Sequence, residues 1–135
     1  MSNLKVYNER SIQLSPISFV NDIQNQLKIR DLDTDSLDFK NKIAVFFTKT
    51  VNLLGIKEAI PDVNKSDIFE MLITQYKGIS IEELYYAFKL ERYGRLVVSD
   101  KFGNKVSKIE HYQIIDSTYV SSVLDKYIDW RVSKI

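Results

Sequence analysis

The clearest helix signal in the chain is the stretch Ser80-Ile81-Glu82-Glu83-Leu84-Tyr85-Tyr86-Ala87-Phe88, followed by a glycine at position 94. Ser80 and Glu83 have the S-x-x-E spacing of a capping box, in which each side chain accepts a hydrogen bond from the other residue's backbone amide. Leu84, Ala87 and Phe88 recur at helical spacing, and a glycine is a common helix terminus. The stretch therefore predicts a helix that begins at Ser80 and ends near Gly94.

Similar signals predict helices on both sides of this one. Before it, Ser66 is the expected cap of a helix that stops at Gly78 and carries Ile68, Phe69, Leu72, Ile73 and Tyr76. After it, Ser117 is expected to open a last helix with one apolar side, formed by Val120, Val123, Leu124, Tyr127 and Ile128.

The N-terminal half predicts two more helices. Pro16 and Ser18 form a start signal, and the apolar residues Phe19, Ile23 and Leu27 follow at helical spacing. A longer helix is expected from about Ser36 to Leu54, with Gly55 as its terminating residue. Residues 1–14 resemble an extended arm.

Strand character is confined to the segment between the last two helices, where residues 96–98 are Leu-Val-Val and residues 102–104, Phe-Gly-Asn, resemble a turn. Two alternatives remain for residues 95–113, a short β-hairpin and an ordered loop. The N-terminal arm could also pair with residues 96–109 to form a small sheet. The fold class expected is mainly α, a compact helical domain of five or six helices. Residues 1–135 would form a single domain, with a subdivision near Pro61 (1–60 and 65–135) as the alternative.

Composition limits the function classes. The chain has 135 residues, 44% of them hydrophobic, with 19 Lys and Arg against 18 Asp and Glu and no Cys. A disulfide framework, a thiolate metal site and a globally basic DNA-coating protein are therefore excluded. No run reaches the roughly 18 apolar residues of a membrane span, and the first residues are too polar for a signal peptide. The expected location is the cytoplasm (of the host cell, for a viral protein), with no membrane contact.

Catalytic motifs are not found. The sequence lacks a phosphate-binding P-loop, a dinucleotide fingerprint and a nucleophile elbow, and three of its four glycines are expected to end helices. His111 is the one imidazole, and it is interpreted as a boundary residue in a loop. Glu82 and Glu83 would point about 100° apart on a helix, one as cap and one solvated. The sequence predicts no enzyme and no cofactor.

Four alternating acids, Asp31, Asp33, Asp35 and Asp38, resemble the opening of an EF-hand calcium loop. That loop requires Gly at its sixth position and a bidentate Glu at its twelfth, and this chain has Ser36 and Lys42 there. The acids are therefore interpreted as a solvated turn before a helix N-terminus, where negative charge is favoured. No metal site is predicted.

A basic stretch at 89–108 carries six cations against Glu91 and Asp100, a local charge of +4. Cations attract phosphates whatever the sequence, and aromatic faces stack on unpaired bases. The expected nucleic-acid contacts combine both types: Lys89, Arg92, Tyr93, Arg95, Lys101, Lys105, Lys108 and Tyr112. The alternative is a solvated face whose aromatics lie in the core.

The aromatic residues are too many to share one core face, so some are expected at a partner surface. Tyr85, Tyr86 and Trp130 are the candidates for that surface. Self-association through it is left open.

Three segments together carry a family resemblance: residues 79–96, the run His111-Tyr112-Gln113, and residues 119–127. Over about residues 76–130 the chain resembles small replication-accessory proteins of bacteriophages and mobile elements, of the helicase-loader kind. The resemblance implies a non-catalytic DNA-replication adaptor that binds a replicative helicase, an initiator or DNA. A loader with its own ATPase would need a phosphate loop, which is missing. Two alternatives remain: a small viral protein that binds and inhibits or scaffolds another protein, for example in host defence, and a structural virion component.

Overall fold

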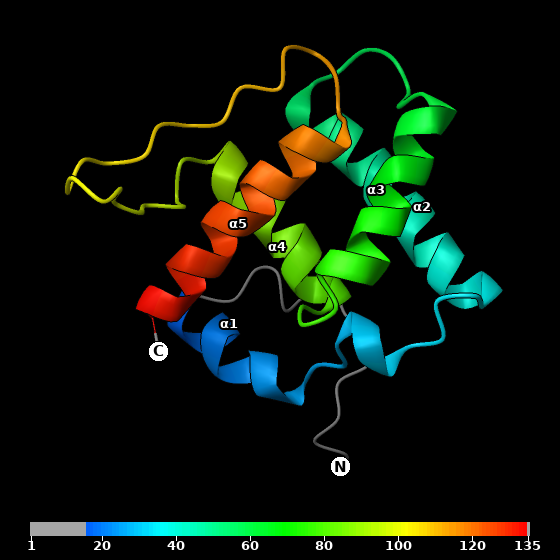
Figure 1. Cartoon of the computed structure of the whole chain (residues 1–135), viewed down its shortest axis with the longest axis horizontal. Coiled ribbons are helices and arrows are strands. Elements are labelled where there is room, and N and C mark those ends of the chain that lie inside the picture. The colour runs from blue at the N-terminus through cyan, green and yellow to red at the C-terminus, as the bar shows by residue number, and fades with distance from the viewer. Residues whose placement is uncertain (1–15, 135) are drawn as a thin grey trace.

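The computed structural model describes residues 16–134, which form five α-helices and two short 3-10 helices (Figure 1). In chain order they are α1 (Pro16–Asp22), η2 (Ile23–Asn25), η3 (Ile29–Asp31), α2 (Leu37–Leu54), α3 (Asp62–Gln75), α4 (Ile81–Arg92) and α5 (Ser117–Ser133). The prediction of a mainly helical fold is confirmed. The predicted arm at 1–14 lies outside the described residues.

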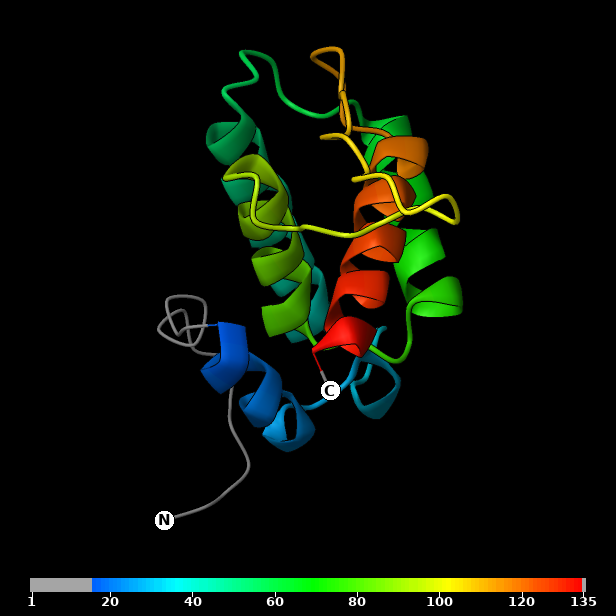
Figure 2. The same cartoon turned by 90° about the vertical axis from the view of Figure 1, so that its left-hand side faces the viewer.

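Helix α4 is the centre of the molecule. It packs against α2 on one side and α5 on the other, while α3 packs on α5. Helix α1 lies across the end of the bundle where α5 ends, and its Phe19 stacks on Tyr86 of α4 with 3.8 Å between ring centroids (Figures 1 and 2). All residues from 81 to 88 are therefore buried, including charged ones.

The ends of α4 and α2 follow the local signals. The Ser80 hydroxyl accepts the amide of Glu83 at 3.0 Å, and the Glu83 carboxylate accepts the amide of Ser80 at 3.1 Å, so the capping box is present. Gly94 has a φ of +69°, and the next amide, Arg95, reaches back to the carbonyl of Leu90 at 2.8 Å. This is a Schellman ending, which favours glycine because a Cβ disfavours positive φ. Ser36 and Gly55 bound α2 as predicted.

Three helix boundaries differ from the predictions. Helix α3 ends at Gln75 rather than at Gly78, whose φ is not positive. Helix α3 begins at Asp62 after Pro61 rather than at Ser66, because proline suits a helix start and an acid favours the first turn. Helix α1 ends at Asp22 and gives way to η2, so the predicted apolar spacing does not continue to Leu27. That side chain is 39% exposed.

One hydrophobic cluster runs from Phe19 to Trp130 and includes buried residues on both sides of Pro61. The segment 95–113 contains one isolated antiparallel bridge, Ser99–Lys105, in an otherwise irregular loop. None of the helices in residues 16–134 has the length and apolar content that a membrane crossing requires.

Candidate nucleic-acid interface

The predicted contacts lie mainly on the connection between α4 and α5, which we call the 93–116 loop. The Schellman ending of α4 turns the chain away from the helices at Gly94. The loop then projects beyond the bundle, and Figure 2 shows its first part, after α4, crossing in front of α5. Of the eight predicted contacts, six belong to this loop, while Lys89 and Arg92 lie in the last turn of α4.

A compact turn shapes the far end of the loop. The Asp100 carboxylate accepts the amides of Phe102 at 2.9 Å and Asn104 at 3.0 Å. Gly103 has a φ of +80° there, and the amide of Asp100 donates to the carbonyl of Asn104 at 2.8 Å. These bonds confirm the predicted turn and place Phe102 at its tip with 76% of its side chain exposed.

A buried ion pair holds the base of the loop. The Lys126 ammonium on α5 lies 2.7 Å from the Glu91 carboxylate of α4, and both side chains are almost fully buried. The same ammonium donates to the carbonyl of Ser107 at 3.0 Å, and the second Glu91 oxygen accepts the amide of Ile109 at 2.7 Å. The loop backbone is therefore fixed to both helices by one pair of charges.

A second turn sits just before α5. The amide of Ile114 donates to the carbonyl of His111 at 3.0 Å, and both central residues, Tyr112 and Gln113, have positive φ (52° and 65°). That combination defines a primed turn, which normally takes Asn-Gly. The amide of Gln113 donates to Nδ1 of His111 at 2.9 Å, which fixes the imidazole against the turn. Tyr112 is held with 81% of its side chain exposed.

The predicted cations of the loop are at the surface. Arg95, Lys101, Lys105 and Lys108 are all exposed, and Lys89 is half-buried. Arg92 is exposed but engaged, because its Nε donates to the carbonyl of Leu53 at the end of α2 at 3.0 Å. Such a contact is the structural role that a cation takes at a helix C-terminus.

The loop also exposes apolar side chains. Half of the large hydrophobic residues that are exposed within the described part of the chain fall on it: Tyr93, Val97, Phe102, Tyr112 and Ile114. Lys101 lies over the Phe102 ring, 5.2 Å from its centroid. The alternative that these aromatics lie in the core is thus wrong for Tyr93 and Tyr112.

The predicted partner surface is not formed. Tyr85, Tyr86 and Trp130 are buried, with at most 7% of each exposed. The prediction was wrong because it assumed that only one side of α4 faces the core. In the structure α1, α2 and α5 surround α4. Glu82, expected to be solvated, is buried as well, and desolvation raises the pKa of its carboxyl above the usual range.

The four acids at 31–38 lie at the surface, in short-range contacts. The Asp31 carboxylate accepts the amide of Lys28 at 3.0 Å, Asp33 accepts that of Asp35 at 3.1 Å, and Asp38 pairs with Lys42 on α2. Within residues 16–134, no cluster of three or more acid or histidine side chains is arranged to hold a metal ion.

A small pocket lies behind the base of the loop, with a volume of about 200 Å³. Arg92, Lys108 and His111 line it together with the buried Tyr119. Burial, and then the charges of Glu91 and Glu110, raise the pKa of the Tyr119 hydroxyl well above its usual range, so it remains a donor. The carboxylates of Glu91 and Glu110 line the same pocket, so its charge is balanced and it does not favour a phosphate.

The sequence did not reveal the buried ion pair of Lys126 and Glu91, which fixes the base of the loop. They are 35 positions apart, and no local motif relates them. Comparison with protein-family models, with curated proteins and with solved structures gave no match to this chain.

Proposed function

We propose that the chain binds single-stranded nucleic acid through the 93–116 loop, as a non-catalytic accessory protein in the replication of bacteriophage or mobile-element DNA. The observation that carries the proposal is the exposure of cations and aromatic rings together on one segment that is fixed at its base. A replicative helicase or an initiator is the protein partner that belongs to this role, and its setting is the cytoplasm of the cell in which that DNA replicates.

The basic stretch at 89–108 presents more positive charge to solvent than its sequence sum of +4 indicates. Of the two acids in the basic stretch, Glu91 faces Lys126 in the interior and does not face solvent. The Asp100 carboxylate accepts two amides within its own turn. The four cations of the loop, Arg95, Lys101, Lys105 and Lys108, are all exposed, and the exposed acids on the same segment are Asp100 and Glu110.

The exposed rings favour single strands over duplexes. Base-paired stacks offer no free ring faces, whereas unpaired bases stack on aromatic side chains and gain about 1–3 kcal/mol each. Tyr112 and Phe102 are more than three-quarters exposed, so a base can reach either ring. Positive φ at Tyr112 and Gln113 is a strained conformation, and strained residues cluster at functional sites.

Charge reversal on the loop tests the phosphate contacts. The triple variant Lys101→Glu, Lys105→Glu and Lys108→Glu is expected to abolish binding to a labelled oligothymidylate, measured by fluorescence anisotropy at about 50 mM salt. For the unmodified protein, the affinity should fall steeply up to about 200 mM salt, as phosphate contacts require. Arg92 is left unchanged because it also caps α2.

The matched control carries three reversals of equal charge elsewhere, at Lys40, Lys57 and Lys77, all of which are exposed. It should bind with nearly the affinity of the unmodified protein. Equal losses in both triple variants would show non-specific attraction, and no binding at low salt would refute the proposal.

Removal of the most exposed ring tests the stacking contact. Tyr112→Asn is expected to weaken binding to single strands about 5- to 150-fold, the loss of one stacked base, with little effect on duplex binding. Asparagine tolerates positive φ, so the turn should be kept. Val63→Ala, at another exposed apolar side chain, is the control and should bind normally. Equal binding by Tyr112→Asn would show that the ring does not stack.

A further inference from the structure

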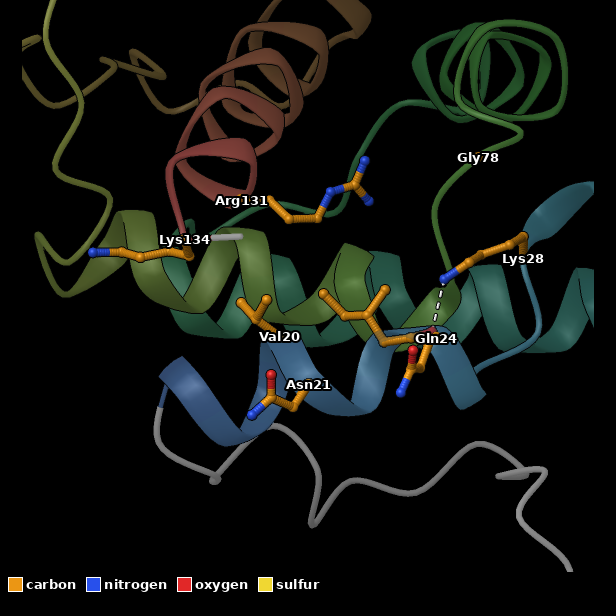
Figure 3. A pocket seen from close by; sticks show the side chains of 8 residues that line it. Val20, Asn21, Gln24, Lys28, Gly78, Arg131 and Lys134 are labelled. Carbon is orange, nitrogen blue, oxygen red and sulfur yellow. Dashed lines mark hydrogen bonds between the residues drawn. The ribbon is translucent and has the colours of Figure 1, made fainter.

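A larger pocket lies at the opposite end of the molecule, where α1 and η2 face the C-terminal end of α5 (Figure 3). Its volume is about 550 Å³. Arg131 reaches it from the last turn of α5, and Lys28 reaches it from the segment between η2 and η3. Lys134, the residue after α5, lies at its rim, and its ammonium points away from the other two cations (Figure 3). Of the described residues that line it, three are therefore cations and none is an acid.

The cations outnumber the charge that they neutralise. One buried carboxylate, Glu83, lies behind the pocket, 2.6 Å from an Nη of Arg131 and 3.6 Å from Nζ of Lys28. Within the described residues, Lys134 contacts the face of Trp130 and no acid. Lys28 and Arg131 against this one carboxylate leave a net charge of +1 at the centre of the pocket, and Lys134 adds a third cation at its rim.

The donors of these cations are only partly used. The Lys28 ammonium donates to the carbonyl of Ile23 at 2.8 Å, which holds it at the pocket wall. Arg131 uses one N–H group for Glu83, and its other N–H groups have no acceptor among residues 16–134. A guanidinium fork binds phosphate oxygens in pairs, so this arrangement suits a phosphate.

The end of α5 works against an anion, because its last carbonyls carry partial negative charge. Arg131 and Lys134 counter that charge, as cations commonly do at a helix C-terminus. Lys28 belongs to a different part of the chain and has no such role. Its position makes the pocket a site where cations from two elements converge.

The opposite wall suits an organic group. Val20 and Ile23 give it an apolar surface, and the amides of Asn21 and Gln24 lie at its edge (Figure 3). The volume falls within the range of about 300–1,000 Å³ that small-molecule sites occupy. We propose that this pocket binds a nucleoside monophosphate or a similar small organic phosphate, with its phosphate on Lys28 and Arg131.

Gly78 allows a test that leaves the ion pairs intact. It lines the pocket, an added Cβ would meet no atom within 4 Å, and its φ lies outside the positive range. Gly78→Glu would therefore bring a negative charge to the pocket without backbone strain. Gly78→Ala and Gly78→Lys are the matched controls, one for the added carbon and one for the sign of the charge.

Calorimetric titration of the full chain with AMP, adenosine and inorganic phosphate measures the effect. We expect AMP to bind, adenosine to bind at least about tenfold more weakly, and Gly78→Glu to lose at least about tenfold in AMP affinity. Gly78→Ala and Gly78→Lys should keep that affinity, and thermal unfolding should confirm that all three variants fold.

Four results would overturn the proposal. No heat with AMP up to millimolar concentration would show that the pocket binds no nucleotide. Equal affinities for AMP and adenosine would show that the cations do not bind the phosphate. Equal affinities for AMP and inorganic phosphate would show that the apolar wall does not bind the nucleoside. A 5′-phosphorylated oligonucleotide is titrated into the triple loop variant, which lacks the proposed strand contacts of the loop. Binding of this oligonucleotide at the pocket without binding of AMP would overturn the proposal and identify the ligand as the end of a strand.

Discussion

Replacement of Lys126 by methionine is expected to lower the free energy of unfolding by about 3–5 kcal/mol. Methionine fills a similar volume, so the loss comes from charge rather than from packing. Glu91 would remain as a buried carboxylate, with only 3% of its side chain exposed, and the carbonyl of Ser107 would lose its donor. A loss of this size is a large part of the 5–15 kcal/mol that typical domains have.

Urea unfolding followed by the fluorescence of Trp130, the single tryptophan, measures this loss. The informative control is the double variant Glu91→Gln with Lys126→Met, in which neither charge is left. It should recover most of the lost stability, because a buried ion pair replaced by neutral groups of similar volume is often close to neutral. Additive losses in the double variant would mean that the two residues act independently.

Removal of the Glu83 carboxylate is the second change with a large expected effect. In the unmodified protein one oxygen of this fully buried group accepts the amide of Ser80, and the other accepts the Tyr127 hydroxyl at 2.7 Å. Burial, with the charge of Glu83, raises the pKa of the Tyr127 hydroxyl far above its usual range, so it is always a donor. Glu83→Ala would leave that hydroxyl buried without an acceptor.

The expected loss for Glu83→Ala is about 2–4 kcal/mol, from the orphaned hydroxyl and the lost helix cap. Arg131 and Lys28 add less, since each has part of its side chain at the surface and can turn to water. Chemical unfolding of Glu83→Ala with and without Tyr127→Phe separates the contributions. If the second substitution restores no stability, the hydroxyl is not what makes the carboxylate important.

The sequence predicted the parts of the fold that depend on neighbouring residues. The capping box at Ser80 and the glycine endings at Gly55 and Gly94 are set within a few positions, and each is present. The start of α3 was misplaced because Pro61 and Ser66 are both acceptable starts, and the local pattern does not decide between them.

The burial of polar groups was not predictable, because their partners are remote in the sequence. Glu83 meets Tyr127 across 44 positions, and Glu91 meets Lys126 across 35. Tyr85 and Tyr86 were expected at a surface because the aromatic residues are too many for one core face. The packing of α1 and α2 on α4 decides their burial instead. For the candidate interface, the irregular sequence of 93–116 indicated a loop with exposed cations and rings. It did not indicate that Lys126 fixes the base of that loop.

Two of the three acids buried in α4, Glu83 and Glu91, find partners on α5, and this order has a consequence for synthesis on the ribosome. Helix α4 emerges before α5, so for a time Glu83 and Glu91 have neither the Tyr127 hydroxyl nor the Lys126 ammonium. The Glu91 carboxylate then keeps its hydration, because burial of an unpaired charge is costly, whereas Glu83 already has the Lys28 ammonium and the Ser80 amide beside it. The nascent α4 is thereby held back from premature packing against α2. The completed core forms only when the last helix supplies both counter-groups, which makes the final segment of the described chain the step that commits the whole domain to its fold.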